Sequence, residues 1–378
     1  MRAGYICAQV SISFPSGCRP GSIRDPHAVS RSEFRGRDIG RCQPAPRTYR
    51  PILVKPEKLA SAMRTDCWLS IIMPTYNGAT YLPAALDSVA NQAGDDVELI
   101  AVDDGSTDAT VGILRSYSGK LRLKLLERIH VGNWVANTNE GLRAAVGAYA
   151  CFLHQDDLWA PNRLEVLRTW TARFPEAVAV LHPVSFVDPS GRRLGCWLCP
   201  LPPGRLLPSD LLLERLLVQN FVAIPSPLFR RRTISTLGGL DEDLWYTADW
   251  DLWLKLATVG PIAVCPDLLA SFRVHPGSIT SSRTADSVEM RRQLEVVLLR
   301  HLATWKLRHP SGCNVERAAR FSIEVNVALA AWAQGRPFGG GRLAIDFARL
   351  GPPGWHRYFR DSRIIERVWA RLRLFRAR

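Results

Sequence analysis

Short apolar runs alternate with amphipathic stretches along the chain between residues 68 and 174. Apolar runs bounded by turn residues are typical of buried strands, whereas apolar residues that recur every three or four positions are typical of helices. The pattern predicts strands at 69–73, 97–102, 121–126 and 149–153, and helices at 81–91, 109–117, 135–146 and 160–174. Strands that alternate with helices in this way predict a mostly parallel sheet with helices on both faces.

The pattern changes after residue 174. We predict a strand at 177–188, a turn at 189–191 and a helix at 209–218, which follows a proline-rich loop. Residues 286–334 are predicted to be helical, with two amphipathic runs at 288–307 and 315–333, and a Gly/Pro break at 335–341 follows them. The sequence therefore predicts an α/β domain with a C-terminal helical extension.

The net charge of +14 is concentrated at the two ends of the chain. Residues 1–62 carry eleven Lys/Arg against four Asp/Glu, and residues 283–378 carry nineteen against eight. Residues 63–282 hold nineteen against twenty-three, so the central part is slightly acidic. A nucleic-acid-binding domain carries its basic residues on the folded recognition surface. We therefore expect no nucleic-acid partner.

The first 62 residues are rich in Arg, Ser, Pro and Gly and show no sustained periodicity, which is typical of disorder. Met63 begins a short polar lead into the first predicted strand. We hypothesise that Met63 is the true start and that residues 1–62 are an upstream-start artefact or a dispensable tail. An intact-mass measurement on the natively expressed protein tests this. The beginning makes a poor signal peptide, and no apolar stretch approaches the ~20 residues of a transmembrane helix.

The nine cysteines form an odd set without the spacing of a disulfide framework. Cys151 lies inside a predicted buried strand, as free cysteines often do. Cys196 and Cys199 form a single CxxC pair, which offers two of the four ligands of a structural zinc site. This set fits a reducing cytoplasm.

Acidic residues follow two predicted strands and begin one predicted helix. Asp103 and Asp104 end the second strand, Asp156 and Asp157 follow the strand at 149–153, and Asp249 begins an aromatic helical stretch. Open α/β sheets bind ligands at the carboxyl ends of their strands, and adjacent carboxylates need a compensating cation. A divalent metal that carries a phosphorylated ligand provides one. Helix capping and Asx turns remain the alternative for Asp103, Asp104 and Asp249.

Six motifs, in order, resemble the family 2 glycosyltransferases with the GT-A fold. The resemblance covers about residues 68–282, and it is carried by segments 70–78, 102–108, 156–161, 237–244, 248–254 and 271–280. It implies a GT-A domain at 63–282, with residues 68–160 on the nucleotide-sugar side and 161–282 on the acceptor side. It also implies an inverting transferase that uses Mn²⁺ or Mg²⁺.

Carried over position by position, the resemblance implies a role for each site residue. Pro74, Tyr76 and Asp104 line the nucleoside pocket, where Tyr76 packs on the base and Asp104 accepts a hydrogen bond from it. Asp156 holds the metal on the diphosphate, and Asp157 assists it or binds sugar hydroxyls. The resemblance also implies that Asp249 is the catalytic base. His275 is either a third metal ligand or phosphate donor, or a hydrogen-bonded loop histidine.

Two positions depart from the family pattern. His154 stands where many members carry the first acid of the DxD motif, and Ala248 stands where many carry Glu before the base. The main expectation is transfer from a nucleotide-diphosphate sugar to a glycan or lipid-linked acceptor in cell-envelope or surface polysaccharide synthesis. The alternative is a family member that binds a sugar nucleotide and has lost catalysis.

Residues 363–376 plot as an amphipathic helix with arginines opposite an apolar face. Such a helix either lies on an anionic membrane surface or docks on the protein's own core. Membrane docking suits an enzyme with a lipid-linked acceptor. We therefore expect a cytoplasmic protein with a peripheral contact at the inner face of the plasma membrane.

Overall fold

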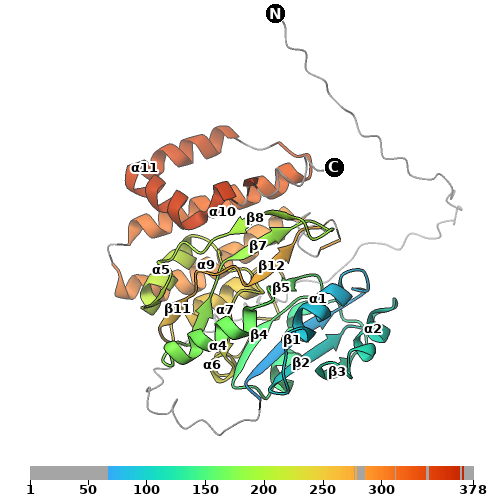
Figure 1. Ribbon diagram of the computed structural model, residues 1–378. Helices are drawn as coiled ribbons and strands as arrows, with labels where there is room; N and C mark the ends of the chain where they lie inside the picture. Colours follow the sequence, from blue (N-terminus) through green and yellow to red (C-terminus); the bar gives the residue numbers. More distant parts are fainter. Residues whose placement is uncertain are drawn as a thin grey trace, which may run out of the picture. The chain divides into compact units, whose positions relative to one another are not determined.

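The computed structural model describes residues 67–275, 277–278, 286–310, 312–337, 340–366 and 368–369. An eight-stranded sheet, in the order β3-β2-β1-β4-β10-β6-β11-β9, organises this part of the chain (Figure 1). Its strands are β1 (Leu69–Thr75), β2 (Val97–Asp103), β3 (Arg122–Glu127), β4 (Tyr149–Phe152), β6 (Ala179–Leu181), β9 (Arg205–Leu207), β10 (Leu228–Arg230) and β11 (Ile262–Val264). The adjacent strands β3, β2, β1 and β4 are parallel to one another, and β6 is parallel to β11. The other neighbouring pairs in this sheet are antiparallel.

Helices cover both faces of the parallel part of this sheet. The first three are α1 (Leu82–Ala90), α2 (Thr110–Ser116) and α3 (Trp134–Ala144). Successive residues of β1 point to opposite faces, so Ile71 packs in the same core as α1 while Ile72 packs in the core that contains α3. Gly141 of α3 brings that helix close to the sheet, because a Cβ there would lie 2.6 Å from Ile72 Cγ2.

A smaller sheet, in the order β5-β12-β7-β8, lies beside the main one. It contains β5 (Leu158–Trp159), β7 (Val184–Val187), β8 (Arg193–Trp197) and β12 (Ala270–Arg273). The single strand predicted at 177–188 is wrong, because β6 and β7 belong to different sheets. The chain leaves the ladder at His182, whose N–H and C=O bond the Ser226 hydroxyl, and Pro183 has no N–H to continue it.

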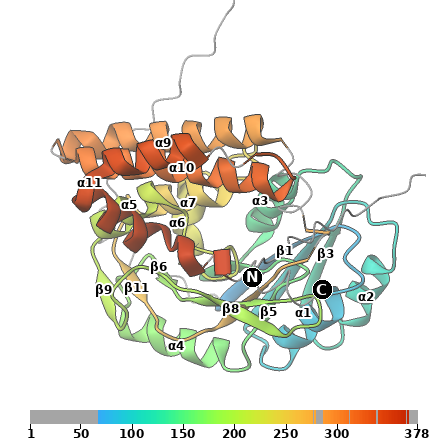
Figure 2. The same ribbon diagram turned by 90° about the horizontal axis from the view of Figure 1, so that it is seen from above.

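The remaining helices are α4 (Arg163–Arg173), α5 (Ser209–Val218), α6 (Arg231–Thr236), α7 (Ala248–Leu256), α9 (Ser287–Arg308), α10 (Cys313–Ala333) and α11 (Gly340–Ser362). Helices α9, α10 and α11 lie side by side (Figure 2), and α10 also packs on α5. Buried Met290 and Trp305 of α9 share a core with Trp253 of α7. The two predicted C-terminal helices are confirmed, and α11, which bends at Gly351 (φ 65°), follows the predicted break.

The predicted fold class is therefore confirmed: a mostly parallel α/β sheet with helices on both faces and a helical C-terminal region. Among the described residues, no helix combines the length and apolar character needed to cross a bilayer. Residues 1–66, Pro276, Ile279 and Thr280 of the last motif, residues 281–282 of the expected domain, and Arg367 and residues 370–376 of the predicted amphipathic tail lie outside the described residues.

Candidate active site at the carboxyl edge of the sheet

The site is built where β1, β2 and β4 end side by side. Pro74 is buried in β1 opposite Val102, and Tyr76, which follows the strand, is 42% exposed. The Gln155 side chain joins the ends of β1 and β4, because its Oε1 accepts from Tyr76 N (2.9 Å) and its Nε2 donates to Tyr76 O (3.0 Å). The chain segments after the two strands are therefore held together by paired amide hydrogen bonds.

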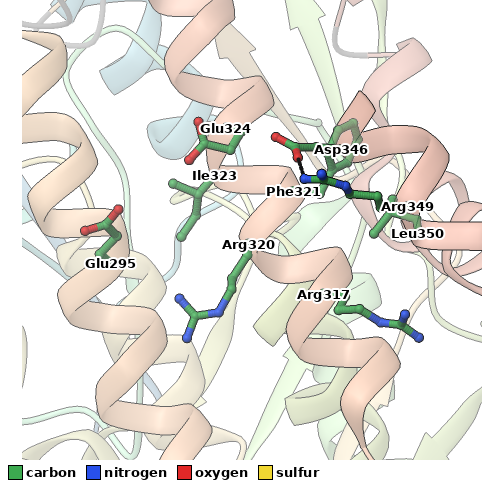
Figure 3. Close-up of a pocket in the computed structure, with 9 residues that line it drawn as sticks. All are labelled: Glu295, Arg317, Arg320, Phe321, Ile323, Glu324, Asp346, Arg349 and Leu350. Carbon is green, nitrogen blue, oxygen red and sulfur yellow. Dashed lines mark hydrogen bonds and ion pairs between the residues drawn. The ribbon is translucent and has the colours of Figure 1, made fainter. Parts of the chain in front are cut away.

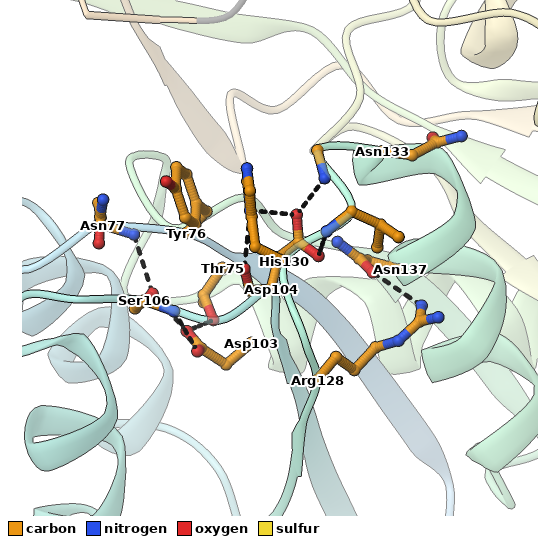
Figure 4. Close-up of polar contacts among 12 residues, drawn as sticks. Thr75, Tyr76, Asn77, Asp103, Asp104, Ser106, Arg128, His130, Asn133 and Asn137 are labelled. Carbon is orange, nitrogen blue, oxygen red and sulfur yellow. Dashed lines mark hydrogen bonds and ion pairs between the residues drawn. The ribbon is translucent and has the colours of Figure 1, made fainter.

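Tyr76 and Asp104 meet through a third residue, His130. The two rings are stacked, with centroids 4.2 Å apart and planes 20° from parallel. His130 Nδ1 lies 3.0 Å from Asp104 Oδ2 (Figure 4). The buried Asp104 carboxylate also accepts hydrogen bonds from the backbone N–H groups of Val131 (3.0 Å) and Gly132 (2.8 Å). The predicted nucleoside-pocket residues are thus brought together, with His130 beside them.

Asp103 and Asp104 have different surroundings although they are adjacent. Asp103 accepts from Thr75 Oγ1 (3.0 Å) and from Ser106 N (2.8 Å), so it closes the turn after β2. That is the Asx-turn role foreseen as the alternative. Gly105 has φ +72°, and a Cβ there would lie 2.9 Å from His130 N, so this turn requires glycine.

Asp156, Asp157 and His154 form one cluster after β4. A potential ligand atom of each lies within 4.8 Å of the others, which is about twice a metal–ligand bond of 2.0–2.6 Å. Arg273 of β12 fixes the cluster, since its N donates to Asp157 Oδ1 (3.0 Å) and its Nε donates to Asp156 O (2.8 Å). Two atoms of the cluster, Asp157 Oδ2 and His154 Nε2, are buried and have no hydrogen-bond partner within the described part of the chain.

Burial and charge set different protonation tendencies in this cluster. Burial, and then the negative charge of Asp156, raise the pKa of Asp157 well above its usual value. Burial also lowers the pKa of His154, which favours its neutral form. Burial opposes ionisation of Asp156, but the hydrogen bond from His275 and the nearby His154 lower the pKa of Asp156. A bound cation would relieve the repulsion between the two carboxylates.

His275 lies next to the cluster and touches Asp156. Its Nε2 is 2.8 Å from Asp156 Oδ2, and its ring lies against Tyr81, with centroids 4.7 Å apart. The residue that joins both carboxylates as a third possible ligand is His154. His275 is thus placed to orient the Asp156 carboxylate.

Asp249 lies in the first turn of α7, where the helix dipole favours a negative charge. Its Oδ2 accepts from Asn220 Nδ2 (3.0 Å), and its Oδ1 accepts from Trp250 N (2.7 Å). Burial raises the pKa of Asp249 to about 6, which is in the range of a general base at neutral pH. Trp134 links this region to the cluster, because its Nε1 donates to Trp245 O and its ring meets His154 edge-on.

Three residues of the site were missed in the sequence: Arg273, Gln155 and His130. Arg273 is 4% exposed, and an arginine inside an apolar strand pattern, two residues before His275, was a usable signal. Gln155 and His130 lie in loops, where no periodicity indicates which side chains face the site.

A separate cavity of about 300 Å³ lies between α9, α10 and α11 (Figure 3). Charged side chains of both signs line it, and two of them, Arg349 and Asp346, pair with each other (3.4 Å). None of the predicted site residues lines this cavity. The candidate site therefore remains at the edge of the sheet.

The fold and the edge site define an open α/β protein of the kind that binds ligands at the carboxyl ends of its strands. Residues 70–216 match the model of glycosyl transferase family 2.

The chain is similar to curated relatives over somewhat more than half its length. It is 31% identical over 229 residues to an uncharacterized glycosyltransferase of Rickettsia typhi, a match that covers 57% of this chain and 66% of the relative. It is also 31% identical over 223 residues to an uncharacterized protein of Mycobacterium tuberculosis, covering 58% of this chain and 62% of the relative. The matched region thus spans less than two thirds of these relatives.

Two kinds of solved structure are also similar. TarS residues 1–349 of S. aureus, in complex with UDP-GlcNAc, align with a TM-score of 0.49 at 19% identity and cover 77% of this chain and 89% of TarS 1–349. The mannosyltransferase PcManGT of Pyrobaculum calidifontis, in complex with GDP-Man and Mn²⁺, aligns with a TM-score of 0.46 at 21% identity. This alignment covers 80% of this chain and 86% of the PcManGT chain.

Proposed function

We propose that this chain is a metal-dependent, inverting glycosyltransferase that moves a sugar from a nucleotide-diphosphate sugar to a glycan or lipid-linked acceptor. The observation that supports this most strongly is the His154–Asp156–Asp157 cluster after β4, which has two buried ligand atoms without a partner among the described residues. The neighbouring strands β1 and β2 are followed directly by Tyr76 and Asp104. The match of residues 70–216 to the model of glycosyl transferase family 2 supports the reaction class.

The cluster fits a divalent metal such as Mn²⁺ or Mg²⁺. Its donors are two carboxylates and a neutral imidazole, which are usual ligands of divalent ions. Asp157 Oδ2 is buried and lacks a partner among the described residues, so it has a ligand position to offer. When bound, the metal supplies positive charge that stabilises the leaving diphosphate of the donor.

The protein side chains perform the remaining tasks in this proposal. Tyr76 packs on the nucleobase, and Asp104 accepts a hydrogen bond from the base. Pro74, which lies in β1 two residues before Tyr76, lines the same pocket. Asp249 takes the proton from the acceptor hydroxyl as that oxygen attacks the anomeric carbon, and the pKa of about 6 leaves it ionised at neutral pH. A single displacement from the face opposite the diphosphate inverts the anomeric centre.

A thermal-shift panel of nucleotide sugars with Mn²⁺ tests the proposal. We expect one donor to raise the melting temperature by several degrees, and that donor to be consumed when an acceptor glycan is supplied. The proposal fails if no nucleotide sugar or nucleoside diphosphate stabilises the protein with either Mn²⁺ or Mg²⁺.

A catalytically silent sugar-nucleotide binder is the second candidate. It is favoured by Ala248, which is fully buried and supplies no carboxylate beside Asp249, and by His154 in place of an acid. Such a protein would bind the donor in the panel but neither transfer nor hydrolyse the sugar when metal is present.

The His154 ligand leads to a prediction about metal choice. Mg²⁺ takes oxygen ligands, whereas transition-metal ions also accept imidazole. We expect His154→Asp to lower the ratio of Mn²⁺ to Mg²⁺ affinity by about tenfold, as measured by calorimetric titration of both ions. His356→Asp, at an exposed histidine of α11, is the control and should keep the ratio. An unchanged ratio in His154→Asp removes His154 from the ligand set.

We also propose that the C-terminal segment 363–376 contacts an anionic membrane surface, which would bring a cytoplasmic enzyme to a lipid-linked acceptor at the inner face of the plasma membrane. Exposed Ile365 and Trp369, among its described residues, support this. We expect the full chain to co-sediment with anionic vesicles more than a chain ending at residue 360. Equal sedimentation favours docking of the segment on the protein itself.

A further inference from the structure

The imidazole of His130 occupies a position with two distinct recognition elements. The ring of Tyr76 stacks on its face, with the ring centroids 4.2 Å apart and the ring planes 20° from parallel. On its edge, Nδ1 lies 3.0 Å from Asp104 Oδ2 and 2.9 Å from Asp104 O. A planar ring is thus stacked on an aromatic surface and presents a nitrogen to a buried carboxylate, as Figure 4 shows.

A nucleobase with a ring N–H would make the same two contacts. Its face would stack on Tyr76, and its N–H would donate to the Asp104 carboxylate. The two rings cannot share the one stacking position, because 4.2 Å between centroids leaves no room for a further ring between them. We propose that His130 holds the place of the donor's nucleobase and must swing out before the donor binds. This inference rests on the proposed function, in which Tyr76 and Asp104 receive the base.

The surroundings of His130 permit this movement. Its side chain is 47% exposed, and its neighbours Ile129 and Val131 are 91% and 60% exposed, so little packing holds the loop tip. The backbone is anchored separately, because Val131 N and Gly132 N donate to Asp104. The His130 ring can therefore leave by rotation of its side chain while the loop backbone remains in place.

Displacement of His130 lowers the apparent affinity for the donor. A ligand that binds only the open state has an apparent dissociation constant raised by the inverse of the open fraction. If the ring is stacked in about nine molecules of ten, its removal tightens donor binding about tenfold. The same competition discriminates against a base without a ring N–H, which would displace His130 and leave the Asp104 carboxylate with one hydrogen bond fewer.

Calorimetric titration of the full chain with uridine diphosphate and with guanosine diphosphate, each with Mn²⁺, tests the proposal. We expect His130→Ala to bind at least one of them about five to ten times more tightly than the unmodified protein. The control is Ile129→Ala, a change at the adjacent exposed position, which should alter the dissociation constant less than about twofold. His130→Phe keeps an aromatic ring over Tyr76 and should show no tightening.

Each outcome bears on the proposal. Equal affinity of His130→Ala and the unmodified protein overturns it, because His130 then does not compete with the base. Weaker binding overturns it as well, because His130 would then be a wall of the pocket. Binding by the unmodified protein together with either result leaves the proposed function intact, whereas absence of binding in every variant removes the proposed function and this inference together.

Nuclear magnetic resonance provides a second readout that a purely structural histidine would not change. The imidazole nitrogen signals of His130, assigned by their loss in His130→Ala, should shift when uridine or guanosine diphosphate is added. The shift should report release of Nδ1 from Asp104. Unchanged His130 signals in the saturated complex contradict the displacement.

Discussion

Replacement of Asp249 by asparagine is expected to lower kcat by about 10²–10⁴-fold, the usual contribution of a general base. Asparagine keeps the size of the side chain, and its single carbonyl oxygen can still accept from Trp250 N, so the start of α7 should keep its shape while the hydrogen bond from Asn220 is lost. The donor dissociation constant should stay within about twofold, because the base acts on the acceptor. Steady-state kinetics and donor calorimetry measure the two quantities.

Asp251 is the matched control on the same turn of α7. Its carboxylate is fully buried and contacts Lys255 (2.7 Å), Arg300 (2.9 Å) and His301 (2.8 Å), so its role is to neutralise buried positive charge. Asp251→Asn should therefore lower the melting temperature, because unpaired buried charges remain. Near-normal turnover by Asp249→Asn would show that another group is the base.

The pH dependence of transfer provides an independent check on Asp249. Burial raises the pKa of this carboxyl to about 6, and only the ionised form can accept a proton. Activity should therefore be lost as the pH falls through about 6, at about tenfold per unit, instead of near the usual value of about 4. A kcat that is constant down to pH 5 contradicts the role of Asp249 as base.

Replacement of Asp157 by asparagine is expected to have opposite effects with and without metal. In the metal-free protein, burial and the negative charge of Asp156 both destabilise the ionised Asp157 carboxylate. A neutral amide should therefore raise the melting temperature, by about 2–4 °C for each kcal/mol gained in the free energy of unfolding. With Mn²⁺, the loss of a ligand should weaken metal binding at least about tenfold, a loss seen even for outer partners of metal ligands. Scanning calorimetry with and without Mn²⁺ measures both.

Asp103 is the comparison for this experiment. Its carboxylate also follows a strand, but Thr75 and Ser106 satisfy it with hydrogen bonds. Asp103→Asn should lower stability with or without Mn²⁺ and should keep the full metal-induced shift. If Asp157→Asn also keeps that shift, Asp157 does not bind the metal and the unpartnered Oδ2 has a purely structural origin.

The regular elements were largely predictable from the local pattern. The strands that became β1, β2, β3 and β4 and the long helices α9 and α10 were located within a few residues, because each carries one continuous face or run of apolar residues. The short strands β10 and β11, each of three residues, carry too few positions for a periodic signal. The break between β6 and β7 also escaped prediction, since both sides of Pro183 are apolar.

The site was predictable in its acids and not in its partners. Adjacent carboxylates at strand ends, such as Asp156 and Asp157, are visible in a sequence because they follow apolar runs directly. Which atom is left without a partner depends on residues more than a hundred positions away, as the hydrogen bond from Arg273 to Asp157 shows. The separate surroundings of Asp103 and Asp104 were likewise invisible in the sequence.

The sequence by itself determined the alternation of strands and helices, the position of acidic residues at strand ends, and the match of residues 70–216 to glycosyl transferase family 2. These are local properties, set by the period of apolar residues and by the order of motifs along the chain. Only the tertiary structure decided that His154 completes the carboxylate cluster, that His275 contacts Asp156, and that His130 stacks on Tyr76. The physical reason is that contacts between loops depend on how the strands are ordered in the sheet, and no periodic pattern within a loop records that order.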